Sequence, residues 1–238
     1  MWVFNKRWTN LSKPPKEIID DACLYLSDAL SDTGFRLVKS KRLLVRKDEN
    51  SDFQFRLNLG TNSRNQRNAR VYFNIHFEVY SDRIKKWRQE FYAVRSLGEP
   101  TALVTNRAIG YLTPQSKFQY GTWNLLETHP EKIIKVLTQS VIPRFGKFEN
   151  PVEFIQEMRN GKPEEFCFDF EVLDFLMCYG GDQYASECLT KMLVERGWVD
   201  EFNRKQDQWR TEGAIDDRQS LINLLVHRSD YFEIPISP

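Results

Sequence analysis

The sequence lacks the motifs by which many enzymes are recognised. No segment matches a glycine-rich phosphate-binding loop, the G-x-S-x-G turn of serine hydrolases or the H-E-x-x-H helix of zinc peptidases. Only three histidines occur, and they lie too far apart in the sequence for any to have a partner at metal-ligand spacing. These absences remove the common signatures of nucleotide-binding, hydrolytic and metal-dependent enzymes. We therefore expect no cofactor and no bound metal.

Cysteine and long apolar runs are also scarce. The four cysteines form no C-x-x-C pair, and three of them lie in apolar helical patterns, which favours buried reduced thiols over a zinc site. No apolar run approaches the roughly 20 residues that a membrane-spanning helix needs. The segment 1–10 shows no signal-peptide pattern. We expect a cytoplasmic protein without membrane contact.

Charge is distributed unevenly along the chain, although the net charge of the 238 residues is only +1. Segment 36–95 holds 15 Lys and Arg against 6 Asp and Glu, whereas segment 164–238 holds 7 against 16. Charges of one sign attract partners of the other sign. Three explanations stay open: the segments neutralise each other in the fold, the basic segment contacts nucleic acid, or the acidic segment contacts a cationic partner.

The clearest structural pattern covers residues 53–80. Over 53–59, Phe and Leu alternate with Gln, Arg and Asn, and over 71–80, Val, Phe and Ile alternate with Tyr, Asn, His and Glu. Successive side chains of a strand point to opposite faces, so each of these strands has one apolar and one polar face. The pattern predicts an antiparallel hairpin packed over a core.

Helical periodicity predicts most of the other elements. A first helix is expected to begin at Pro14 and Pro15 and to end before Gly34. Further helices are expected over 81–97, 128–143 (ended by Pro143), 151–161, 170–180, 182–197 and 216–227, and further strands over 35–47, 102–112 and 118–125. The predicted fold class is α+β: an antiparallel β-sheet meander packed on the N-terminal helix, followed by an α-helical C-terminal region. We expect a sheet domain over 1–162 and an acidic helical region over 163–238, which can also pack as one unit.

Polar residues of the hairpin and of its loop form the candidate binding surface. The loop 61–70 carries three arginines among Asn and Gln, which can contact phosphates and base edges, but such a loop can equally be solvated and disordered. His76 and Glu78 lie two residues apart on one strand, so they share a face and could act as a general base, or simply be satisfied by ordinary hydrogen bonds. The candidate binding residues are Arg56, Asn58, Arg64, Arg67, Arg70, Tyr72, Asn74, His76 and Glu78. Tyr80 could join them, and no residue is assigned a catalytic role.

Several segments occur in an order that resembles a known family. A helix ending in L-S-D-T-G-F-R is followed by K-S-K-R-L-L-V-R-K, F-R-L-N-L-G and V-Y-F-N-I-H-F-E-V-Y. Later come a Gly-Tyr-Leu-Thr-Pro segment, a strand at Trp123 and a helix with I-P-R-F-G-K-F. Over roughly 14–161 this order resembles the bacterial family called domain of unknown function 4304. The resemblance implies a small bacterial α+β domain and assigns no activity and no catalytic residue.

Two functions agree with these features. The first is a non-enzymatic bacterial protein-binding domain, such as an immunity or accessory protein, that binds a basic protein partner through its acidic third. The alternative is a nucleic-acid-binding protein that uses segment 36–95, whose affinity would fall steeply with salt. The sequence pI of 7.6 favours the first, because nucleic-acid-binding domains often exceed a pI of about 9. Catalysis by His76 and Glu78 is a third and weaker hypothesis.

Overall fold

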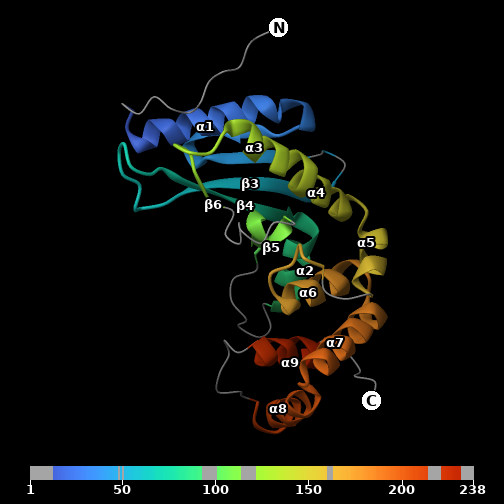
Figure 1. Cartoon of the computed structure of the whole chain (residues 1–238). Helices are drawn as coiled ribbons and strands as arrows, with labels where there is room; N and C mark the ends of the chain where they lie inside the picture. Colours follow the sequence, from blue (N-terminus) through green and yellow to red (C-terminus); the bar gives the residue numbers. More distant parts are fainter. Residues whose placement is uncertain are drawn as a thin grey trace. The chain divides into compact units, whose positions relative to one another are not determined.

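The computed structural model describes residues 13–47, 49, 51–92, 101–113, 122–159, 163–213 and 221–231 (Figure 1). The chain forms two compact units, and each is discontinuous in sequence. The first unit contains residues 1–82 and 102–149, and the second contains residues 83–101 and 150–238. The division therefore differs from the one at residue 162 that the sequence suggests, because 83–101 and 150–162 belong with the C-terminal helices.

An antiparallel sheet forms the centre of the first unit. Its strands are β1 (Arg36–Val38), β2 (Leu43–Lys47), β3 (Phe53–Thr61), β4 (Tyr72–Ser81), β5 (Leu103–Ala108) and β6 (Thr122–Asn124). The order β1-β2-β3-β4-β5 follows the chain, and β6 pairs with the first part of β4. The predicted α+β class and the predicted hairpin are both confirmed. Residues 118–121 of the predicted strand 118–125 lie outside the described residues.

One face of this sheet is apolar and is buried. Phe55 and Leu57 of β3 lie opposite Val79 and Phe77 of β4, and all four are at most 1% exposed. The helices α1 (Pro15–Ala29), α3 (Pro130–Val136) and α4 (Ile142–Glu149) lie along one side of the sheet (Figure 1). The alternation that the sequence shows therefore has its physical cause in a helical layer that covers the apolar face.

The helical segment 130–149 corrects one prediction. Pro143 does not end the helix, because α3 continues through a π turn (Leu137–Val141) into α4. The amide of Ile142 bonds to the carbonyl oxygen of Leu137, and this wider turn accommodates the proline, which has no N–H to donate. Beyond it, the ring of Phe145 stacks on Phe77, with ring centroids 4.2 Å apart.

The second unit is helical. It contains α2 (Asp82–Tyr92) from Arg83 onward, α5 (Pro151–Met158), α6 (Asp169–Tyr179), α7 (Asp182–Arg196), α8 (Val199–Glu212) and α9 (Leu221–Tyr231). Helix α8 is absent from the prediction because it carries few apolar residues, and only Phe202 and Gln206 of it are buried. Residues 93–97 and 216–220 of two predicted helices lie outside the described residues.

A buried ion cluster joins three helices of the second unit. Asp174 of α6 is fully buried and accepts hydrogen bonds from Arg88 of α2 at 2.7 and 2.9 Å. Its other oxygen accepts a bond of 2.7 Å from Arg228 of α9. Arg88 also donates to the carbonyl oxygen of Thr101. One carboxylate therefore ties segment 83–101 to the C-terminal helices, which explains why the two belong to one unit.

No disulfide joins the four cysteines in this structure. Cys23, Cys178 and Cys188 are buried, and Cys167 is partly exposed. Burial raises the pKa of Cys23 to about 11 and the pKa of Cys188 to about 12. Among the described residues, no helix combines the length and the apolar character that a membrane span requires.

Candidate functional site

The sheet face opposite the phenylalanines is polar. Register places Arg56 of β3 beside Glu78 of β4, and Glu78 beside Asn106 of β5. In the same way Asn58 lies beside His76. We call the following residues the polar face: Gln54, Arg56, Asn58, Tyr72, Asn74, His76, Glu78, Tyr80 and Asn106. Strand alternation therefore brings the six predicted strand residues onto one surface of the first unit.

Glu78 is the centre of a hydrogen-bond network on this face. Its side chain is buried, with only 5% of the residue exposed. One carboxylate oxygen accepts a bond of 3.0 Å from Asn58, and the other accepts a bond of 3.2 Å from the hydroxyl of Tyr80. Burial, and then the charge of Glu78, raise the pKa of Tyr80. Glu78 is thus occupied as an acceptor that fixes its neighbours.

His76 bonds to other partners. Its Nδ1 lies 3.0 Å from Oδ1 of Asn106, and its Nε2 lies 3.5 Å from Nδ2 of Asn74. This arrangement places the proton on Nδ1 and makes Nε2 the acceptor. Among the described residues, no hydrogen bond joins His76 to Glu78, so the two do not form the pair that a general base with a carboxylate partner requires.

Arg56 is held flat against an aromatic ring. Its guanidinium carbon lies 3.7 Å from the ring centroid of Tyr80, and its Nε donates to Gln54 at 2.6 Å. Stacking and this bond fix the side chain, which stays half-buried. The polar face therefore presents a guanidinium group in a fixed orientation.

Asn74 lies at the end of the face nearest the hairpin loop. Its amide covers Gly60 so closely that a Cβ at position 60 would collide with Oδ1 of Asn74. This Oδ1 is buried and has no hydrogen-bond partner among the described residues. Asn74 also lines a polar pocket of about 250 Å³, together with Thr61, Asn62, Ser63, Tyr72, Phe73 and Thr122.

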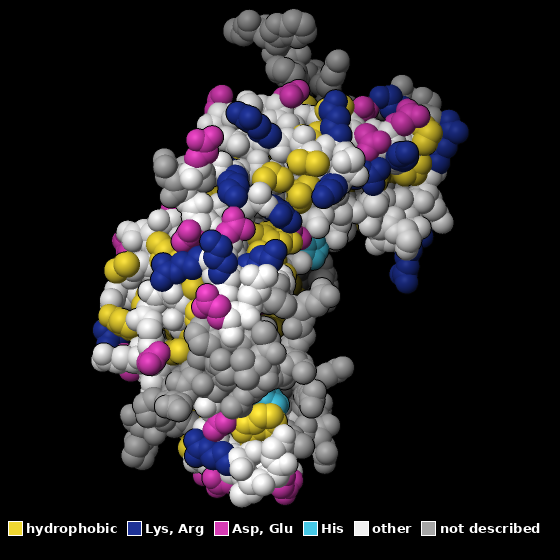
Figure 2. All heavy atoms as spheres, turned by 180° about the vertical axis from the view of Figure 1, so that it is seen from behind, with side chains coloured by type: hydrophobic (Ala, Val, Ile, Leu, Met, Phe, Trp, Pro, Cys, Tyr) yellow, Lys and Arg dark blue, Asp and Glu magenta, His cyan; other side chains and the backbone are white. Residues whose placement is uncertain are grey.

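The three predicted arginines of the hairpin lie beside the polar face, in the connection between β3 and β4. We call residues 62–71 the arginine loop. Arg64 and Arg67 are exposed, and Arg70 is half-buried. Seen from behind, Lys and Arg side chains are spread over the upper and middle parts of the surface, with Asp and Glu side chains between them (Figure 2).

Comparison of the chain with protein-family models, curated proteins and solved structures finds no match. The resemblance to the domain of unknown function 4304 therefore stays a prediction, and the geometry of the site alone must support any function.

Ion pairs inside each unit account for part of the uneven charge. In the basic segment, Arg42 pairs with Asp20 at 3.0 Å and Lys47 pairs with Asp82 at 3.2 Å. In the acidic segment, Asp174 is buried between two arginines, and Glu171 accepts hydrogen bonds from the backbone at the start of α6. Part of the charge that the sequence offers for partners is thus used within the fold.

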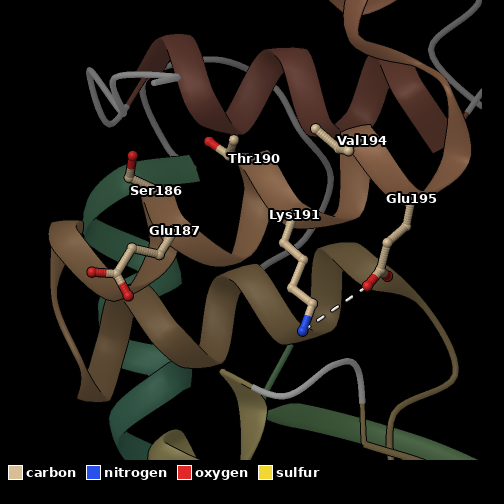
Figure 3. A pocket seen from close by; sticks show the side chains of 6 residues that line it. All are labelled: Ser186, Glu187, Thr190, Lys191, Val194 and Glu195. Carbon is tan, nitrogen blue, oxygen red and sulfur yellow. Dashed lines mark ion pairs between the residues drawn. The ribbon is translucent and has the colours of Figure 1, made fainter. Parts of the chain in front are cut away.

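A larger hollow lies along α7 of the second unit (Figure 3). This open groove of about 530 Å³ is lined by Ser186, Glu187, Thr190, Lys191, Val194 and Glu195. Lys191 and Glu195 pair at 4.0 Å, and Glu187 pairs with Arg159 at 2.8 Å. Its described lining includes no His or Cys. Across the part of the chain that the structure describes, no group of three or more His, Cys, Asp or Glu side chains could hold a metal ion.

Two members of the polar face, Gln54 and Asn106, are missing from the predicted site, and a third, Tyr80, is only an optional member of it. Gln54 continues the alternation of β3, and the same signal could have identified it. Tyr80 lies at the end of the predicted strand and turns out to bond to Glu78. Asn106 could not be found from the sequence, because only the pairing of β4 with β5 brings it to His76.

Proposed function

We propose that this chain is a non-catalytic protein-binding domain and that the polar face is its binding surface. The observation that carries the proposal is the hydrogen-bond network of Glu78 and His76. Both groups that could do acid–base chemistry are bonded to separate neighbours, at 3.0 to 3.5 Å. The network holds Asn, Tyr and Arg side chains in fixed positions, which suits recognition by shape and hydrogen bonding.

The composition of the face favours a protein partner. The centres of protein–protein interfaces are rich in Tyr and Arg and poor in Asp, Glu and Lys. The polar face has two tyrosines and Arg56, and its one carboxylate is buried and already bonded. Asn58 and Asn106 are exposed and add amide donors and acceptors.

A role as an immunity or accessory protein belongs to this proposal, but the contact differs from the acidic third that the sequence suggests. Asp169, Glu171 and Asp174 are buried in the second unit. Asp169 pairs with Arg196. Carboxylates placed in this way contribute little to the attraction of a distant cation, so we place the contact on the first unit.

Site-specific photo-cross-linking tests the proposal. A cross-linking residue at Asn106 should capture a protein in cells that produce the chain, and the same residue at Lys135 on α3 should not. The captured protein is then purified and its affinity measured. Arg56→Ala should weaken binding at least tenfold, or about 1.4 kcal/mol, because arginines that a partner covers at the centre of an interface are frequent hot spots.

The matched control is Lys135→Ala, which truncates an exposed cation outside the polar face. Equal affinities for both variants and the wild type would refute the polar face as the binding surface. Capture of nucleic acid instead of protein at Asn106 would also reject the proposal.

A further inference from the structure

We infer that the arginine loop is a preformed anchor for an acidic segment of the protein partner. The inference rests on the proposed function, since it names the chemistry of the partner beside the polar face. Residues 53–77 contain four arginines and no Asp or Glu. Three of these arginines lie in the loop. No described carboxylate pairs with Arg64 or Arg70, in contrast to Arg42 and Lys47 of the same unit.

Asn65 fixes the base of the loop. Its Nδ2 donates to the hydroxyl of Thr61 at 2.9 Å and to the carbonyl oxygen of Tyr72 at 3.1 Å. Its Oδ1 accepts from the amide of Tyr72 at 2.7 Å. One amide side chain thus joins the last residue of β3 to the first residue of β4, which holds the two ends of the loop at a set distance.

The tip of the loop is a closed turn. Gln66 and Arg70 exchange two backbone hydrogen bonds of 2.9 and 3.1 Å, and Asn68 has a left-handed φ of 60° that this turn requires. Nε of Arg70 donates to the carbonyl oxygen of Arg64 at 3.3 Å. The loop backbone is therefore ordered before a partner arrives, and binding has to order only the arginine side chains.

The chemistry of the loop fits carboxylates. A guanidinium group binds a carboxylate through two parallel N–H···O bonds, which are stronger than bonds between neutral groups. The polar pocket at the loop base adds amide and hydroxyl groups, since Thr61, Asn62 and Ser63 line it.

The size of the positive region favours a peptide over a nucleic acid. Three phosphate contacts would give a slope of only about −2 in log affinity against log salt for a single strand. The adjoining polar face adds one more cation, Arg56, and is otherwise uncharged apart from the bonded Glu78. A polynucleotide that continued past the loop would meet few further cations there, whereas a peptide would meet amide and hydroxyl groups.

Fluorescence anisotropy with two defined probes tests the inference. The probes are a labelled decaglutamate peptide and a labelled ten-nucleotide oligodeoxythymidine, titrated with the full chain at low salt. We expect the peptide to bind more tightly than the oligonucleotide. Arg64→Gln/Arg67→Gln should weaken peptide binding at least tenfold. The control Lys85→Gln/Lys86→Gln removes the same charge from exposed positions on α2 and should change it less than twofold.

Three results would overturn the inference: no peptide binding, an equal loss in both double variants, or tighter and loop-dependent binding of the oligonucleotide. The proposed function has its own readout in the Arg56→Ala variant and the purified partner. If Arg56→Ala weakens that complex while the Arg64/Arg67 variant does not, the inference about the loop fails and the proposed function stands. If neither variant weakens it, both fail.

Discussion

Removal of the Asp174 charge should severely destabilise the second unit. Asp174 is 0% exposed, and the side chains of Arg88 and Arg228 are only 4% and 7% exposed. Asp174→Asn keeps the shape of the side chain but takes a counter-charge from two buried guanidinium groups. Breaking a buried ion pair in this way costs about 3–5 kcal/mol. Because two arginines depend on one carboxylate, we expect the upper half of that range.

Urea unfolding followed by circular dichroism at 222 nm measures the effect, since the second unit is helical. A loss of about 4 kcal/mol and a slope of about 2 kcal/mol per M would lower the unfolding midpoint by about 2 M. Such a loss is a large part of the roughly 5–15 kcal/mol that stabilises a domain.

The matched control is Glu187→Gln in the same unit. Glu187 also pairs with an arginine, Arg159 at 2.8 Å, and this pair lowers the pKa of Glu187. Both partners are exposed, so solvent screens the pair, and the midpoint should stay close to that of the wild type. A midpoint for Asp174→Asn no lower than that of Glu187→Gln would refute the reasoning.

A triple variant separates charge from packing. Arg88→Met/Asp174→Leu/Arg228→Leu removes the whole cluster and leaves no buried charge from it. We expect this variant to be more stable than Asp174→Asn alone, because apolar replacements of a complete buried cluster are often neutral or stabilising. If the triple variant is the less stable of the two, the hydrogen bonds and shape of the cluster matter more than its charge balance.

Three further predictions use the same unfolding assay. Gly60→Ala should destabilise the chain, because the new methyl group displaces the side-chain amide of Asn74. The control Gly146→Ala on α4 has room for the methyl group and should stabilise the chain by about 0.5–1 kcal/mol. A stabilising effect of Gly60→Ala would contradict this packing. Phe145→Ala should lower the free energy of unfolding by about 3–5 kcal/mol, since this ring is fully buried against the rings of Phe35, Phe55 and Phe77. A loss below about 1 kcal/mol would show that this contact does not anchor α4 to the sheet. Burial raises the pKa of Cys23 to about 11 and of Cys188 to about 12, so the folded state keeps thiol protons that the unfolded state loses above its pKa near 9. Stability should therefore be unaffected by these thiols below about pH 9 and fall as the pH rises toward 11, and the Cys23→Ala/Cys188→Ala variant should show a smaller fall over that window.

Local sequence patterns are enough to predict the central hairpin and the first helix of the first unit. Strict alternation over 53–59 and 71–80 specifies the hairpin and its two faces, because a shift by one residue would expose every phenylalanine. The first helix follows from Pro14, Pro15 and an apolar stripe, all of which act within one or two turns. For the same reason six of the nine candidate site residues could be assigned to one face before any tertiary contact was known.

Contacts between residues far apart in the sequence could not be predicted and depend on the tertiary fold. Asn106 reaches His76 through the pairing of β5 with β4, and the sequence carries no local signal for that register. Pro143 stays inside a helix because a π turn and the contact of Phe145 with the sheet outweigh its local tendency to end one. Arg88 joins the second unit because Asp174, 86 residues away, supplies the buried counter-charge. In each case the deciding contact is made with a distant partner, through strand pairing for Asn106 and through burial for Phe145 and Asp174, and a local sequence pattern does not contain it.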